Sequence, residues 1–215
     1  MAKRLLYVLQ GNWRYIGIAA FLMVMGGVIG YIDDQFGEML KHMIDNISKS
    51  VKQEQVGSGI FWMIFKNNVM VAMMMIGLGI FFIGIFPACI LLINGAIVGF
   101  LLKTISLKGI SAGKLLIGGI LPHGILELSM IILSGAIGIK LGVKLYEWLL
   151  AVFIPERRKA ANDQLYKLLE QLPFLFGTIV LGLFVAAIIE TMITPYILHA
   201  LLTTQEESVI KQIFK

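Results

Sequence analysis

Long apolar runs, separated by polar segments, are the feature of this sequence that most limits its fold. The chain has 215 residues, of which 58% are hydrophobic and 14% are charged, whereas a soluble domain usually has about 25% charged residues. A helix needs about 20 apolar residues to cross a bilayer. The candidate spans are residues 16–32, 69–86, 88–102, 115–139 and 174–199. We therefore predict an all-α fold, a polytopic integral membrane helical bundle that forms a single domain over residues 1–215.

Two of the polar segments are expected to lie at the membrane surface. Apolar residues recur with helical spacing in residues 36–56 and 140–170, and this pattern is typical of amphipathic helices. We therefore expect two amphipathic interfacial helices beside about five transmembrane helices. A sixth span at 141–154, or a re-entrant turn around Pro122, is an alternative to the five-span interpretation.

The second and third spans are expected to form a tight hairpin. Residues 69–86 and 88–102 have almost no loop between them, so the chain must turn near Gly84–Pro87. Asn67 and Asn68 directly precede the second span. Because asparagine is a common N-cap residue, one of these two is predicted to cap that helix.

Basic residues are unevenly distributed along the chain. Half of the 18 Lys and Arg residues lie in residues 1–15 and 140–172, and cytoplasmic segments of membrane proteins carry an excess of such residues. This bias predicts a multi-pass protein of the cell (cytoplasmic) membrane with a cytoplasmic amino terminus and no cleavable signal peptide. The net charge of +5 favours contact of the protein with anionic lipid in the bilayer. Nucleic acid is not expected as a partner, because no basic cluster is interleaved with aromatic residues.

Ionisable residues lie inside two of the apolar spans. His123 and Glu127 are in the fourth span and Glu190 is in the fifth. A spacing of four residues puts His123 and Glu127 on one helix face, and Pro122 is expected to kink or break the helix just before them. Ionisable groups at membrane depth are costly and usually face a partner, a cavity or water. We therefore predict that Glu190 lies within reach of His123 or Glu127.

Asn94 is the fourth predicted member of this buried polar site. It lies in the middle of the third span, where its side chain is expected to hydrogen-bond to a neighbouring helix or to line a polar cavity. Pro87 and Pro195 are expected, like Pro122, to kink the helices that contain them.

Three interpretations of the buried polar site remain open. It could be polar glue between helices, a path for protons or a solute, or a metal or hydrolytic centre. In the last case His123, Glu127 and Glu190 would bind a divalent metal such as zinc. No cofactor is certain and no catalytic residue is assigned, since the sequence lacks the HExxH signature of zinc proteases.

Glycine pairs at a spacing of four residues indicate close helix packing. They are Gly95 with Gly99 and Gly138 with Gly142. Small residues at this spacing let helix backbones approach closely in membranes. The same pattern is compatible with a homodimer.

The order of these motifs resembles the stage II sporulation protein M family. The elements that carry the resemblance are Asn67-Asn68, Asn94-Gly95 followed by Gly99, Pro122-His123-Gly124 with Glu127, Gly138-x-x-x-Gly142, and Glu190 with Thr194-Pro195. The resemblance runs over roughly residues 1–200. It implies a polytopic membrane fold, like that of the bacterial and archaeal members of the family.

The resemblance also implies a function. The founding member looks like a scaffold in the septal membrane of spore-forming bacteria, where it acts with two peptidoglycan-degrading partners during engulfment. By this resemblance, the chain is expected to be a non-enzymatic scaffold for an envelope or septal membrane complex, with envelope-associated protein partners. The alternative is a membrane transporter or a metal-dependent intramembrane enzyme that uses His123, Glu127 and Glu190.

Overall fold

The computed structural model describes residues 2–33, 58–81, 83–203 and 206, and every regular element in this part of the chain is helical. The elements are α1 (Ala2–Ile32), α3 (Ser58–Gly79), α4 (Ile85–Leu107), α5 (Ala112–Leu115), the π-helical turn η1 (Leu116–Ile120), α6 (Leu121–Ala151), α7 (Pro155–Ile188), the π-helical turn η2 (Ile189–Ile193) and α8 (Thr194–Leu201). The predicted all-α fold is confirmed. The amphipathic helix expected at 36–56 lies outside the described residues.

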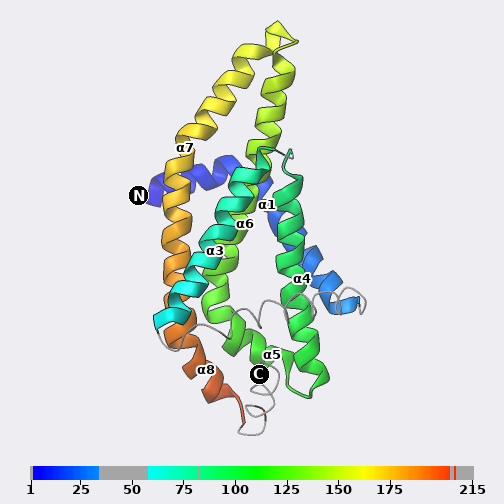
Figure 1. The fold of residues 1–215 in the computed structure, drawn as a ribbon, viewed down its shortest axis with the longest axis vertical. Helices are drawn as coiled ribbons and strands as arrows, with labels where there is room; N and C mark the ends of the chain where they lie inside the picture. The colour runs from blue at the N-terminus through cyan, green and yellow to red at the C-terminus, as the bar shows by residue number, and fades with distance from the viewer. Residues whose placement is uncertain (1, 34–57, 82, 204–205, 207–215) are drawn as a thin grey trace.

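Five helical segments are long and apolar enough to cross a membrane, as predicted. They are Leu5–Ile32, Gly59–Gly79, Ile85–Leu107, Leu116–Ala151 and Pro155–Leu201. Figure 1 shows them as an elongated bundle in which α3, α4, α6 and α7 run upright and α1 crosses behind α4. Residues 141–154 do not form a sixth span, because α6 continues through them as far as Ala151.

Residues 140–170 do not form one continuous helix. These residues are the end of α6 and the beginning of α7, which pair as a helical hairpin that extends beyond the other helices (Figure 1). Polar side chains join the two arms: the Trp148 ring N–H donates to Asn162 Oδ1 at 2.5 Å, and Lys144 Nζ donates to Gln164 Oε1 at 2.8 Å. We call residues 140–170 the projecting hairpin. Leu141, Ala151 and Leu168 are buried in this hairpin, whereas Leu149, Val152 and Phe153 near its tip remain exposed.

The predicted hairpin of the second and third spans is present, but its turn comes earlier than expected. Helix α3 ends at Gly79, and the chain turns back through Gly84, which has a positive φ of 82°. The Gly84 N–H donates to the Gly79 carbonyl oxygen at 3.0 Å. Pro87 therefore lies in the first turn of α4, where its missing N–H has no helical partner to lose. The predicted kink at Pro87 is not observed.

The predicted N-cap at Asn67 or Asn68 is wrong. Helix α3 begins at Ser58, so both asparagines lie in its interior. Residues 60–65, which precede the two asparagines, are apolar and belong to the membrane span that begins at Gly59. Asn68 is half-buried, whereas Asn67 is exposed.

Glycines form two close helix crossings in the bundle. A Cβ atom added to Gly95 or Gly99 of α4 would overlap the Met23 or Gly27 carbonyl oxygen of α1. In the same way, a Cβ atom on Gly138 of α6 would overlap the carbonyl oxygen of Met75 in α3. Gly142 of α6 faces the end of α3. These four glycines therefore serve packing within one chain, and the predicted homodimer has no separate support from them.

The packing of α6 against α7 sets the depth in the bundle at which His123, Glu127 and Glu190 lie. Leu133 and Ile137 of α6 are buried against Leu175, Ile179 and Leu183 of α7 in one apolar cluster. In Figure 1, the start of α6 lies beside the end of α7 towards the lower end of the bundle. Apolar packing therefore brings two segments that are distant in sequence to the same depth.

The last described residue, Glu206, returns to α5. Its carboxylate lies 3.0 Å from Lys114 Nζ and accepts the Thr203 backbone N–H at 2.8 Å. The Thr203 N–H, together with the Lys114 ammonium group, lowers the pKa of Glu206 to about 2. Glu206 therefore remains ionised at neutral pH, and its contact with Lys114 links the residues after α8 to the short helix α5.

The structure predicts which loops share a side of the membrane. The beginning of α1 and the base of the projecting hairpin line one common cavity, whereas Lys108 follows α4 at the opposite end of the bundle. In a Cys89→Ala background, we expect cysteines at positions 3 and 158 to react from the same side and a cysteine at 108 from the other. With a cytoplasmic amino terminus, an impermeant thiol reagent labels only position 108 in intact cells. Labelling of positions 3 and 158 from opposite sides would contradict this topology.

Candidate metal centre

His123 and Glu127 lie near the start of α6, directly after the π-helical turn η1. Pro122 is the second residue of α6. A proline inside a helix has no N–H for the preceding turn and its ring crowds that turn, and a π-helical turn is one way for the backbone to accommodate this. The helix is thus locally irregular just before His123. The sequence predicted a kink or break at Pro122, and the structure has a π-helical turn directly before it.

Glu190 lies in an equivalent arrangement on the other side of the site. It is part of the π-helical turn η2, and Pro195 is the second residue of the following helix, α8. Both halves of the site therefore consist of a π-helical turn followed by a helix with proline at its second position. Short π-helical segments are rare and frequently occur at functional sites.

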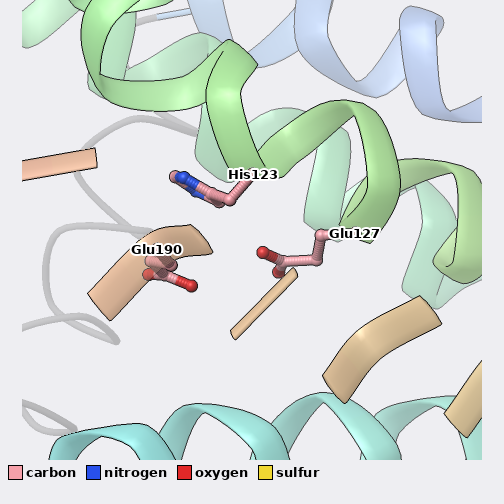
Figure 2. Close-up of side chains that lie close together, drawn as sticks. All are labelled: His123, Glu127 and Glu190. Atoms are coloured by element: carbon pink, nitrogen blue, oxygen red, sulfur yellow. The ribbon is translucent and has the colours of Figure 1, made fainter. Parts of the chain in front are cut away.

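The structure brings the three predicted ionisable residues together. One ring nitrogen of His123 and one carboxylate oxygen each of Glu127 and Glu190 all lie within 4.8 Å of one another. Figure 2 shows that His123 and Glu127 project from α6 towards Glu190 on the facing segment. All three side chains are half-buried. Glu190 is thus within reach of both partners, as its burial in an apolar span led us to expect.

Thr194 orients the His123 ring. The Thr194 hydroxyl donates to the Ile189 carbonyl oxygen at 3.2 Å and lies 3.1 Å from His123 Nδ1. A hydroxyl group has a single proton to donate. When that proton goes to Ile189, the Thr194 oxygen accepts a hydrogen bond from Nδ1–H of His123, and when it goes to Nδ1, the ring proton is on Nε2. In the first arrangement the lone pair of a neutral His123 is on Nε2, which is then the free ligand atom.

Asn68 adds a third helix to the site. Its side chain, from the interior of α3, hydrogen-bonds to the Glu127 carboxylate. Sequence reasoning treated Asn68 as a helix cap and did not assign it to the site. The available signal was its place in an apolar stretch, because a lone amide at membrane depth needs a polar partner.

Asn94 does not belong to this cluster. Its amide donates to the Ile90 carbonyl oxygen at 3.1 Å, one turn earlier in the same helix. The predicted interhelical hydrogen bond of Asn94 is therefore wrong. Helix α4 carries none of the three ionisable residues, and it packs on α1 at the glycines beside Asn94.

The cluster has the chemistry of a cation site. Two carboxylates at this separation repel each other unless they share a proton or hold a cation between them. Ligand atoms around a zinc-type ion lie about 3.4 Å apart at bond lengths of about 2.0–2.2 Å. Small side-chain rotations would bring His123, Glu127 and Glu190 to that spacing. Imidazole with carboxylates suits divalent ions such as zinc or manganese.

Comparison with known proteins identifies one family whose model covers most of the chain. A model of the family described as stage II sporulation protein M matches residues 14–195. An uncharacterized protein of Methanocaldococcus jannaschii is 31% identical over 192 residues, which cover 86% of this chain and 97% of the relative. A second uncharacterized protein of the same organism is 27% identical over 190 residues, which cover 88% of this chain and 74% of the relative. No solved structure matches the chain.

Proposed function

The chain belongs to the stage II sporulation protein M family, and we propose that it is a non-enzymatic scaffold for a complex of the cell envelope or septal membrane. It is a multi-pass membrane protein, which we place in the cytoplasmic membrane with its amino terminus in the cytoplasm. The projecting hairpin extends beyond the other helices (Figure 1), and we propose that protein partners bind to it. A scaffold has to hold such a surface in one fixed orientation.

The observation that carries the proposal is the cluster of His123, Glu127 and Glu190. Its ligand atoms come from two segments far apart in sequence, the start of α6 and the turn η2. We propose that a divalent metal ion binds between them and ties these segments together. Because α6 and α7 continue from the site to the projecting hairpin at the other end of the bundle, the ion would fix the far ends of the two helices that carry the hairpin.

Metal analysis of the purified protein tests this proposal. We expect about one zinc-type ion per chain in the wild type and loss of that ion in His123→Ala and Glu190→Gln, because three ligands are needed to hold it. His199→Ala is the matched control, since His199 is exposed on α8 outside the cluster. Elemental analysis after dialysis provides the measurement. Wild-type protein without bound metal, or equal metal content in all variants, would contradict the proposal.

Thermal denaturation separates a structural ion from a catalytic or transported one. An ion that binds only the folded state stabilises it, so we expect chelation to lower the denaturation midpoint of the wild type to that of His123→Ala. The same chelator should leave the midpoint of His123→Ala unchanged. A bound ion whose removal leaves the wild-type midpoint unchanged would argue against the scaffold role.

That last result would favour the second candidate function, a metal-dependent intramembrane enzyme or a transporter. Two observations support this candidate. Three protein ligands leave a coordination position for water or substrate, and the site lies between two interrupted helices, as transport sites commonly do. Half-burial of the three ligands is compatible with access from the membrane surface.

A further inference from the structure

A second polar site lies at the opposite end of the bundle from the metal centre. A cavity of about 740 Å³ opens between the first half of α1, the end of α6 and the beginning of α7. Along α6, Lys140 of this cavity lies 17 residues after His123, or about 25 Å at 1.5 Å per residue. The cavity is therefore independent of the metal centre and of the function proposed for it.

The cavity is strongly basic. Arg14, Lys140, Lys144 and Lys167 line it, together with tyrosine and glutamine side chains, and none of its lining residues is acidic. Among these four, Lys144 has a carboxylate partner, Glu147, at 2.7 Å. Lys140 and Lys167 instead lie over the rings of Tyr15 and Tyr7, each 5.9 Å from the ring centroid. Most of the positive charge in the cavity is therefore not neutralised by the described part of the protein.

Lys140 is held in place by a buried polar group. Its Nζ donates to Asn12 Oδ1 at 2.7 Å, and the Asn12 amide donates in turn to the Val8 carbonyl oxygen at 2.6 Å. Asn12 is only 2% exposed. A buried polar group costs free energy unless it is hydrogen-bonded, and the bonds of Asn12 to Lys140 and to Val8 satisfy it while they fix the ammonium group at the cavity.

The shape and depth of the cavity fit a phosphate-bearing ligand. Its volume lies within the range of about 300–1,000 Å³ that is typical of small-molecule sites. Ammonium and guanidinium groups, with tyrosine hydroxyl and glutamine amide groups around them, are the donors that bind phosphate. Basic cavities between membrane helices near the cytoplasmic surface bind anionic lipid headgroups. Ile18 and Leu168 provide an apolar part of the lining.

We propose that this cavity binds a phosphate group, supplied by an anionic phospholipid headgroup or by a free phosphate compound. The four basic side chains neutralise the phosphate oxygens, and the glutamine and tyrosine side chains complete the hydrogen bonds. Because α1, α6 and α7 all contribute, the bound anion joins the amino-terminal helix to the base of the projecting hairpin.

The test uses the full-length protein in a neutral detergent. Binding is followed by the rise in denaturation midpoint with short-chain phosphatidylglycerol, short-chain phosphatidylcholine, glycerol 3-phosphate and inorganic phosphate. We expect saturable stabilisation by phosphatidylglycerol and none by phosphatidylcholine. Equal stabilisation by glycerol 3-phosphate or inorganic phosphate would also support the site and identify its source as a free phosphate compound. Absence of saturable binding by all three anions would overturn the proposal.

Variants connect the binding to the cavity. Arg14→Gln combined with Lys167→Gln removes two exposed cavity charges and leaves the buried Lys140–Asn12 contact intact. We expect about 30-fold weaker anion binding, since each basic residue near a membrane surface contributes about fivefold. Arg157→Gln combined with Lys159→Gln is the matched control, because both residues are exposed on the projecting hairpin outside the cavity. Equal weakening in the two double variants would refute a site at the cavity.

Discussion

The Gly138→Ala variant is expected to lose the close crossing of α3 and α6 and to denature roughly 4–10 °C below the wild type. A methyl group at this position would overlap the Met75 carbonyl oxygen and lie 2.9 Å from the Met75 carbonyl carbon. Both atoms belong to helix backbone, so no side-chain rotation can relieve the overlap. The two helices would have to separate, which also disturbs the turn at Gly79 and Gly84.

A matched glycine distinguishes this overlap from a general effect of the added methyl group. Gly77 lies in α3 close to the same crossing, but a Cβ atom there would meet nothing within 4 Å. Alanine also forms helices better than glycine does, so Gly77→Ala is expected to leave the midpoint unchanged or slightly raised. Size-exclusion chromatography of detergent extracts after heating gives both midpoints. A Gly138→Ala midpoint no lower than that of Gly77→Ala would show that the crossing is looser than the structure describes.

The membrane spans were predictable because a helix surrounded by lipid needs a long run of apolar residues, and such runs are visible in the sequence. The ends of the spans were less predictable, since a helix can continue beyond the apolar core of the bilayer. This is the case at residues 140–170, where the same amphipathic pattern suits a helix lying on a membrane and one arm of a helical hairpin. The hydrogen bonds of Trp148 with Asn162 and of Lys144 with Gln164 show that these residues form a helical hairpin. The spacing of apolar residues in the sequence does not tell which side chains will pair.

The candidate site was predictable in part, because ionisable residues stand out in an apolar span. The spacing of four residues puts His123 and Glu127 on one face of a helix. Glu190 lies in an apolar span, where a carboxylate needs a polar partner, so it was expected near them. The contacts of Asn68 and Thr194 depend on how α3 and the turn η2 pack against α6. The argument that a polar side chain in an apolar span needs a partner on another helix does not hold for Asn94. An asparagine inside a helix can donate its amide to a backbone carbonyl of the same helix.

Asn68 therefore gives a sharp test of whether the cluster is organised for metal. If its amide orients Glu127 as a ligand, Asn68→Ala is expected to weaken metal binding by about 10- to 100-fold, which is the usual effect of removing a group that positions a metal ligand. The three ligands themselves remain, so some binding should persist, in contrast to its loss in His123→Ala. Competition with a chromogenic zinc chelator measures both affinities.

Asn67 is the matched control for that experiment, because it is the chain neighbour of Asn68 on α3 and its side chain is exposed. We expect Asn67→Ala to bind metal like the wild type and to fold like Asn68→Ala, as monitored by the denaturation midpoint of the metal-free proteins. A similar affinity in the two variants would mean that Glu127 needs no support from α3. The hydrogen bond between α3 and α6 would then stabilise helix packing alone, as the polar-glue interpretation holds.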